Sequence, residues 1–262
     1  MKKGTALTKS ILYVVCISTC LFTACGNEDD DSKTDTNKAT IDIVRSKEQG
    51  VIVNGLIGEH TYVDLGLKSR TLWATYNVGA SKTSESGNYF AWGETKSKPY
   101  YRKNTYKWSS LDTLTENPSG LEIFNIYTLT KYYGNERVLE AEDDAATANW
   151  GPDWRMPTKA ELEELLESCE WKWTDHFKDT NAKGCIGTSK INGYTIFFPF
   201  MMSALEAKVS RYVCYYWSST LDEDNIGKAY CGILSDGRKD ISPLSQFRYS
   251  GELVRAVVSK KE

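Results

Sequence analysis

The stretch "WGPDWRMPTKAELEELLESC" (Trp150–Cys169) contains the clearest helix in the chain. Thr158 stands where a helix N-cap is expected, and Glu161 follows three residues later, which is the spacing of a capping box. Three leucines then fall on one helical face: Leu162, Leu165 and Leu166. An apolar stripe of this kind packs onto a core. We therefore expect an amphipathic helix over about residues 158–168.

The residues in front of this helix are expected to be structural rather than catalytic. Pro157 fixes the entering backbone and biases Met156 away from helical angles. Trp150 and Trp154 offer large, rigid apolar surfaces that can lock the start of the helix onto a core. The sequence thus predicts a firmly held join between a loop and the main helix.

Outward from this helix, the sequence is rich in short strand-like runs. The C-terminal side contains "NGYTIFFPF", "CYYWSST", "KAYCGIL" and "GELVRAVV", and the N-terminal side contains the glycine-broken run "VIVNGLIGEHTYVDLGL". Such runs, bounded by turn residues, are typical of β-strands joined by tight turns. We expect one α+β domain over residues 51–262, with short, mostly antiparallel strands, one main helix and long loops.

Residues 1–24 read as a signal peptide. Lysines are followed by an apolar run over residues 11–24 that is too short to span a bilayer. The run ends in "LFTAC", which resembles the lipobox of bacterial lipoproteins, so Cys25 is expected to be the lipidated first residue of the mature chain. An ordinary cleaved signal followed by a chance cysteine is the alternative.

Residues 25–50 read as a disordered, acidic tether, because their polar composition cannot bury enough surface to become ordered. The acidic run at residues 28–31 resembles the export signal of Bacteroidetes surface lipoproteins. We therefore expect an outer-membrane lipoprotein that is exposed at the cell surface and contacts the membrane through its lipid. A solvated linker without an export role is the alternative.

Composition excludes two broad classes of protein. The chain has 262 residues, of which 40% are hydrophobic and 26% are charged, with a net charge of -3. This is an ordinary water-soluble composition, and it gives no indication of a membrane-spanning body. The chain also lacks the basic surplus that phosphate backbones require, so we expect no nucleic-acid partner.

Six motifs carry a family resemblance, and they occur in this order: "YVDLGL", "WATYNVGA", "YFAWGE", "WRMPTKAELEEL", "YWSST" and "VRAVV". Between Tyr62 and Val258 they resemble the Fibrobacter succinogenes major paralogous domain and the related Legionella collagen-like C-terminal domain. The resemblance implies a C-type-lectin-like α+β fold in a bacterial cell-envelope protein, distantly related to formylglycine-generating enzymes. It brings no catalytic motif.

Metal and catalytic chemistry have little support in the sequence. The only histidines, His60 and His176, lie in no recognisable ligand spacing. The acidic run "EAEDDAAT" (residues 140–147) lacks the alternating ligands and central glycine of an EF-hand, so we expect a capped helical turn there. No serine has a Gly-x-Ser-x-Gly context. We expect no catalytic residue, no metal and no cofactor, and an enzyme is the least favoured function.

Four cysteines follow the lipidation site: Cys169, Cys185, Cys214 and Cys231. If a hairpin turns symmetrically about residues 222–223, Cys214 and Cys231 lie opposite one another and form a candidate cross-strand disulfide. Four buried free thiols are the alternative.

Three charged residues lie within apolar motifs: Glu94, Arg155 and Arg255. Charges in such settings are rarely buried unless they are paired. We expect Glu94 to form an ion pair with one of the two arginines.

Two segments are candidate ligand-binding loops. In lectin-like folds the loops of the small C-terminal sheet bind ligands, and "MMSALEAKVSRY" occupies the matching place, with Arg211 and Tyr212 at its end. The other segment is aromatic and cationic and contains Tyr101, Tyr106 and Trp108. Flat rings beside cationic donors suit sugar faces or acidic groups, although these rings could instead cover the core.

The sequence therefore predicts a cell-envelope lipoprotein that displays a lectin-like domain for an extracellular glycan or protein ligand. The alternative is a structural or assembly subunit of a surface appendage.

Overall fold

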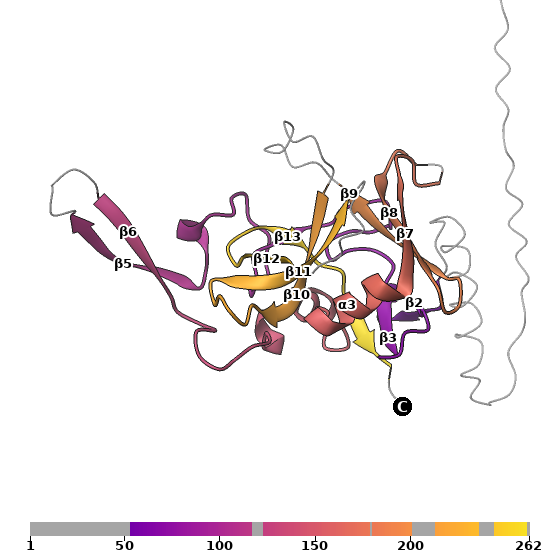
Figure 1. Cartoon of the computed structure of the whole chain (residues 1–262), viewed down its shortest axis with the longest axis horizontal. Helices are drawn as coiled ribbons and strands as arrows, with labels where there is room; N and C mark the ends of the chain where they lie inside the picture. Colours follow the sequence, from indigo (N-terminus) through magenta and orange to yellow (C-terminus); the bar gives the residue numbers. More distant parts are fainter. Residues whose placement is uncertain (1–52, 117–122, 179, 201–212, 236–243, 261–262) are drawn as a thin grey trace, which may run out of the picture.

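The computed structural model describes residues 53–116, 123–178, 180–200, 213–235 and 244–260, and these residues form a mixed α+β fold (Figure 1). The helical elements are η1 (Lys103–Thr105), η2 (Ala141–Asp143), α2 (Ala145–Trp150) and α3 (Lys159–Ser168). The first strands are β1 (Gly55–Ile57), β2 (His60–Val63), β3 (Thr71–Ala74), β4 (Tyr89–Phe90), β5 (Ser109–Glu116), β6 (Ile123–Leu129) and β7 (Cys169–Thr174). The remaining strands are β8 (Lys183–Ser189), β9 (Thr195–Phe200), β10 (Val213–Leu221), β11 (Lys228–Ser235), β12 (Leu244–Phe247), β13 (Glu252–Leu253) and β14 (Val257–Ser259).

The strands form four sheets. Their orders are β1-β2-β3-β14, β12-β11-β10-β13-β4, β7-β8-β9 and β5-β6. Neighbouring strands are antiparallel, apart from the parallel pair of β10 and β13. The first sheet joins β3 to β14, so segments from both ends of the domain lie side by side. The predicted α+β class with mostly antiparallel strands is confirmed.

The main helix α3 begins as the sequence predicts. The hydroxyl of Thr158 accepts a hydrogen bond from the backbone N–H of Glu161, and the Glu161 carboxylate accepts one from the backbone N–H of Thr158. The three leucines on its inner face are buried. Gly232 on β11 faces these leucines, and a Cβ added there would lie 3.4 Å from the Leu162 side chain, which is ordinary van der Waals distance.

The residues before α3 are structural, as expected. Trp154 is 1% exposed, and its Nε1 donates to the carbonyl of Ile57 at 3.2 Å. Trp150 stacks on the ring of His60, with ring centres 3.9 Å apart. Arg155 is bonded through its backbone to Val257 of β14 in both directions. The segment before α3 therefore connects the first turn of the domain, the main helix and the last strand.

The expected ion pair between Glu94 and an arginine is wrong. Glu94 accepts a hydrogen bond from Lys98 Nζ at 2.7 Å, and Arg155 pairs with Glu161 instead. Arg255 is 0% exposed. Its guanidinium donates hydrogen bonds to Oδ1 of Asn77 and to the backbone carbonyls of Ala74 and Phe197. Backbone carbonyls and an amide, rather than a carboxylate, hold this buried guanidinium.

The expected Cys214–Cys231 disulfide is also wrong. The hairpin of β10 and β11 pairs Cys214 with Leu234 and pairs Cys231 with Trp217, so the two thiols are three residues out of register. The register also shifts between Trp217 and Leu221, on the side of these pairs that is nearer the turn. All four described cysteines are buried free thiols, which was the alternative.

The strands β5 and β6 form a separate two-stranded ribbon, named here the arm. Figure 1 shows the arm extending from the left of the molecule, away from the other sheets. Within the part of the chain that the structure describes, no helix is both long and apolar enough to cross a membrane.

Candidate functional site

Charged and aromatic side chains gather where the arm joins the rest of the domain. We name this group the arm-base cluster, and it consists of Glu94, Lys107, Trp108, Lys131, Glu140, Glu142 and Asp143. Lys107 and Trp108 come from the loop before β5, and Lys131 follows the end of β6 by two positions. The carboxylates of residues 140, 142 and 143 come from η2 and the residue just before it. The cluster therefore depends on the paired ends of both arm strands being held beside η2.

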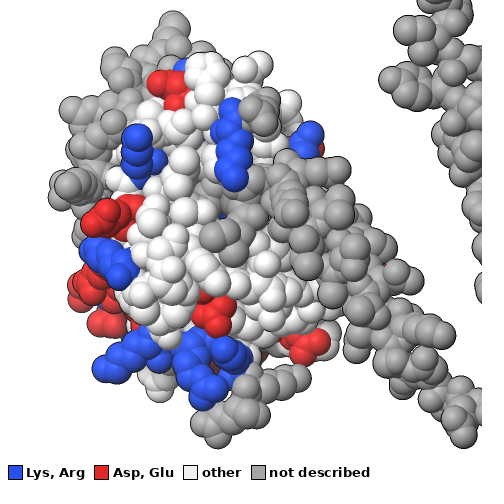
Figure 2. Space-filling model, turned by 90° about the vertical axis from the view of Figure 1, so that its right-hand side faces the viewer, with Lys and Arg blue, Asp and Glu red and all other residues white. Residues whose placement is uncertain are grey.

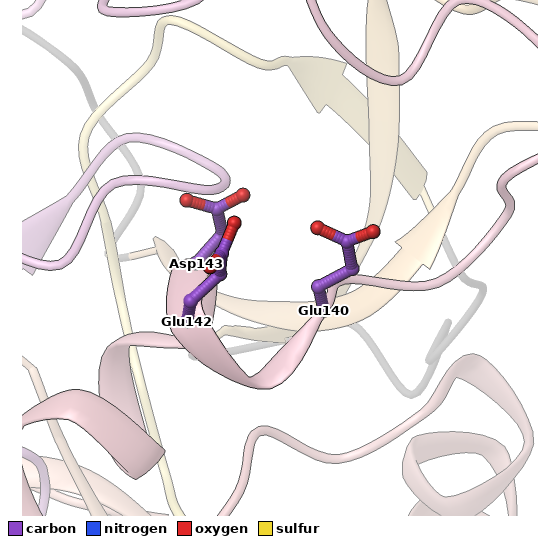
Figure 3. Close-up of side chains that lie close together, drawn as sticks. All are labelled: Glu140, Glu142 and Asp143. Carbon is purple, nitrogen blue, oxygen red and sulfur yellow. The ribbon is translucent and has the colours of Figure 1, made fainter.

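Three carboxylates converge at η2. Glu140, Glu142 and Asp143 place oxygens within 4.8 Å of one another, and Figure 3 shows their side chains projecting from this one turn. The cation that they hold is the ammonium of Lys131, which lies 2.6 Å from Glu140, 3.0 Å from Glu142 and 2.6 Å from Asp143. An internal lysine therefore occupies the position that a metal ion would need.

Asp143 is the buried member of this group. It is 2% exposed, and its Oδ2 also accepts a hydrogen bond from the Tyr132 hydroxyl at 2.8 Å. Burial acts to raise the pKa of Asp143, but hydrogen bonds from Lys131, Tyr132 and Lys107 outweigh it and lower that pKa below its usual value. The same carboxylate bonds raise the pKa of Lys131. Both groups are therefore held in their charged forms.

Trp108 lies between two ammonium groups and the protein core. Lys107 Nζ is 4.0 Å and Lys131 Nζ is 5.1 Å from the centre of the indole ring. The indole Nε1 donates to the Gly93 carbonyl at 2.9 Å. Gly93 has a φ of +76°, and a Cβ there would lie 3.1 Å from this nitrogen, so glycine permits the close approach.

Arg248 lies beneath the cluster and is 1% exposed. Its Nε donates to the Tyr106 hydroxyl at 2.9 Å, and its terminal nitrogens donate to the carbonyls of Lys131 and Tyr132 at 2.9 and 3.3 Å. Its guanidinium carbon also lies 5.0 Å from the centre of the Trp92 ring. This arginine thus ties both sides of the arm base to the core.

The candidate aromatic residues from the sequence have different environments. Tyr106 is 4% exposed, and its hydroxyl donates to the Trp92 carbonyl, so its ring is packed into the domain and is not presented on the surface. Tyr101 is half-buried, and its hydroxyl donates to the Tyr89 carbonyl. Trp108 is half-buried and belongs to the arm-base cluster. The rings therefore cover the core to a large extent, as the alternative held.

Arg211 and Tyr212, the other candidates, lie outside the described residues.

Sequence reasoning missed Lys131 as a site residue. It placed the acidic run at residues 140–147 in a capped helical turn, and this is confirmed, because Asp144 accepts from the backbone N–H groups of Ala146 and Thr147 at the start of α2. Nothing in the sequence indicated that a lysine nine residues before Glu140 would enter that turn. The missing information was the path of the loop between β6 and η2.

The exposed groups of the cluster are suited to binding. The side chains of Lys107, Glu140 and Glu142 are 53%, 55% and 74% exposed, so they present one cation and two anions next to a half-buried indole. Figure 2 shows the opposite end of the molecule, where charges of both signs surround a largely uncharged centre. The visible surface there carries no extended field of one sign.

No protein-family model, curated protein or solved structure matches the chain.

Proposed function

We propose that this chain is a lipid-anchored protein of the bacterial cell envelope whose folded domain binds an extracellular glycan or protein ligand at the arm-base cluster. One observation carries the proposal: the partly accessible ring of Trp108 lies 4.0 Å from the ammonium of exposed Lys107 and 5.1 Å from that of Lys131, which holds the exposed carboxylates of Glu140 and Glu142. Sugar hydroxyls need both donors and acceptors beside a flat apolar face, and this cluster supplies all three.

The ionisation of the cluster favours binding over proton transfer. A general acid or base works best when its pKa lies near the working pH. Here the pKa of Asp143 is lowered and that of Lys131 is raised, while burial raises the pKa of Tyr132 to about 12. At neutral pH these three groups act as fixed charges and hydrogen-bond donors or acceptors.

We also propose that the α+β architecture is of the C-type-lectin-like kind. The short, mostly antiparallel strands and the single long helix α3 agree with that proposal. The ordered sequence motifs between Tyr62 and Val258 also support it.

A panel of glycans and envelope proteins tests the binding site. The double variant Lys107→Ala/Glu142→Ala should weaken binding of any ligand found by roughly tenfold or more, because each exposed polar contact contributes about 0.5 to 1.5 kcal/mol. Both side chains are more than half exposed, so the melting temperature should hardly change. Lys172→Ala, an exposed change on β7, is the matched control. Unchanged binding in the double variant would contradict the assignment of the binding site to this cluster.

The lipid anchor is tested separately by metabolic labelling with a fatty-acid analogue. Cys25 lies outside the described residues, and the proposal rests on the small residues before it and on the apolar run over residues 11–24. Cys25→Ala should abolish labelling and release the folded domain from the membrane fraction, while Cys20→Ala should not. Labelling that persists in Cys25→Ala contradicts lipidation at this residue.

The second candidate function, a structural or assembly subunit of a surface appendage, is favoured by the arm alone. A ribbon that projects from the domain and pairs with no other described strand is suited to contact another subunit.

A further inference from the structure

The described chain begins at the end of the molecule that lies opposite the arm. Asn54 is joined to the loop after β2, because its Oδ1 accepts a hydrogen bond from the backbone N–H of Asp64 at 2.7 Å. Figure 1 shows β2 and β3 at the right of the molecule and the arm at the left. The residues that precede Asn54 therefore join the domain on the side away from the arm.

Three segments meet around this point. We name their surface the entry face, and it consists of the loop over residues 64–70, the β8–β9 turn over residues 190–194 and Lys260. The side-chain amide of Asn192 donates to the Asp64 carbonyl at 2.9 Å, and Lys260 Nζ lies 3.1 Å from Asp64 Oδ2. A Cβ added to Gly66 would lie 3.1 Å from Cγ2 of Ile191, so the turn packs directly on the loop. The entry face is therefore one continuous surface.

This face presents an apolar side chain beside exposed cations. Ile191 is 58% exposed, and both Lys190 and Lys68 are exposed. Lys190 Nζ donates to the backbone carbonyl of Glu167 at 2.7 Å, and neither lysine forms an ion pair with a described carboxylate. An apolar group flanked by long cationic side chains suits the boundary between lipid acyl chains and phosphate headgroups.

Carboxylates also lie near the entry face, so its net charge is small. Asp64 pairs with Lys260, and Glu164 of α3 accepts a hydrogen bond from the backbone N–H of Ser69 at 2.9 Å. Glu167 is exposed on the same helix. Electrostatic attraction alone would therefore hold this face only weakly to an anionic surface.

A lipid anchor makes a weak contact sufficient, and in this respect the inference rests on the proposed lipidation of Cys25. A chain of the length of residues 25–52 has an average end-to-end distance of about 30 Å as a random coil. An anchor at that range keeps the domain at high local concentration beside the bilayer. The face that lies at the attachment point is the one that meets the bilayer most readily.

We propose that the entry face docks on the surface of the membrane that holds the lipid anchor. Ile191 enters the boundary between headgroups and acyl chains, and Lys68 and Lys190 contact lipid phosphates. The arm and the arm-base cluster then point away from the membrane, toward ligands in solution.

Spin labelling of the full lipidated chain in vesicles tests this orientation. Ile191→Cys can be labelled selectively, because the four described cysteines are buried and Cys25 would carry the lipid. Val138→Cys is the matched control, since Val138 is another β-branched residue, 47% exposed, and lies two positions before Glu140 of the arm-base cluster.

The vesicles contain phosphatidylcholine and phosphatidylglycerol in equal parts. Accessibility to a water-soluble nickel relaxation agent should be about threefold or more lower for the label at residue 191 than for the label at residue 138. Accessibility to oxygen, which concentrates in lipid, should be higher at residue 191. Equal accessibility at the two positions, or protection of residue 138 alone, overturns the proposal.

Charge reversal tests the contact with phosphate. In the Ile191→Cys background, Lys68→Glu/Lys190→Glu should raise accessibility to the nickel agent about twofold or more. Arg102→Glu/Lys103→Glu, a change of two exposed cations beside the arm, is the matched control and should leave it unchanged. The same accessibility in both double variants contradicts the proposed contact.

Flotation of the vesicles separates this inference from the proposed anchor. A chain that does not float with the vesicles rejects lipidation and the docked orientation together. A chain that floats while residue 191 stays accessible to the nickel agent rejects the docked orientation alone.

Discussion

The carboxylate of Glu161 accepts two hydrogen bonds from the guanidinium of Arg155, with Nη1 2.7 Å from Oε2 and Nη2 2.5 Å from Oε1. It also accepts hydrogen bonds from the backbone N–H of Thr158 and from the hydroxyl of Thr71, each at 2.8 Å. One side chain thus joins the start of α3 to β3 and to the segment bridged with β14.

This arrangement predicts a specific pH dependence of stability. Burial alone would raise the pKa of Glu161, but its hydrogen bonds with Arg155 and Thr158 outweigh burial and lower that pKa from 4.5 to about 2. The stabilising contribution is therefore complete above about pH 4.5 and is lost as the pH falls toward 2. Glu161→Gln should destabilise the protein by up to about 3 kcal/mol at pH 7, and the difference from wild type should shrink below pH 4.5.

Urea unfolding at several pH values between 7 and 3 measures this difference. Glu167→Gln, an exposed change on the same helix, is the control. A constant difference between wild type and Glu161→Gln across this range would show that the carboxylate contributes through its shape rather than its charge.

The two arginines that lie in apolar motifs should respond very differently to lysine. Arg255 is fully buried and donates to Asn77, Ala74 and Phe197, which a single ammonium cannot reach together. Arg255→Lys should therefore cost roughly 2 to 4 kcal/mol, because buried acceptors lose their donors. Arg155→Lys, with a side chain 34% exposed, should cost less than about 2 kcal/mol. Thermal and urea unfolding of both variants give the comparison, and equal losses would contradict it.

Two buried tryptophans form a natural pair for measuring one hydrogen bond. Trp92 Nε1 donates to the Ser218 carbonyl at 2.9 Å, whereas Trp73 Nε1 has no hydrogen-bond partner among the described residues. Both side chains are 0% exposed, so replacement by phenylalanine removes a similar volume from each. Trp92→Phe should destabilise the protein by about 1 to 3 kcal/mol more than Trp73→Phe, because the Ser218 carbonyl is left unpaired. A larger loss in Trp73→Phe would refute this ranking.

Removing the central ammonium of the arm-base cluster should expose the repulsion among its carboxylates. Lys131→Met leaves Glu140, Glu142 and Asp143 within 4.8 Å of one another without their cation, and we expect a loss of roughly 1 to 2 kcal/mol at pH 7. The loss should diminish as the pH falls and the carboxylates take up protons. Lys107→Met, whose ammonium is 53% exposed and 3.3 Å from Asp143, should cost less than about 1 kcal/mol. Unfolding curves at pH 7 and pH 4 separate the two, and a pH-independent loss would count against repulsion.

What could be predicted from the sequence was mostly local. The cap of α3 depends on Thr158 and Glu161, which are three residues apart, so spacing alone revealed it. The partners of Cys214 and Cys231 depend on the register of a hairpin, and neither that register nor its bulge after Trp217 has a sequence signature. The contacts of Lys131 depend on the path of the loop between β6 and η2, which local rules do not describe.

The Glu94 prediction failed for a different reason. The rule that a charge in an apolar motif needs a partner was correct, because Glu94 is 7% exposed and accepts hydrogen bonds from Lys98 Nζ and the backbone N–H of Lys107. The partner is the lysine only four residues further along the chain, and not an arginine of another apolar motif. Arg255 shows that uncharged acceptors can hold a buried guanidinium in this fold.

The hydrogen bonds of Arg248 also determine how the arm responds to force. The guanidinium holds the carbonyls of Lys131 and Tyr132 on one side of the arm base and the Tyr106 hydroxyl on the other. A pull on the arm tip is therefore resisted by bonds inside the hydrophobic core rather than by a hinge at the surface. Bending the ribbon away from the domain is therefore expected to break hydrogen bonds of a buried guanidinium, and not only contacts at the surface.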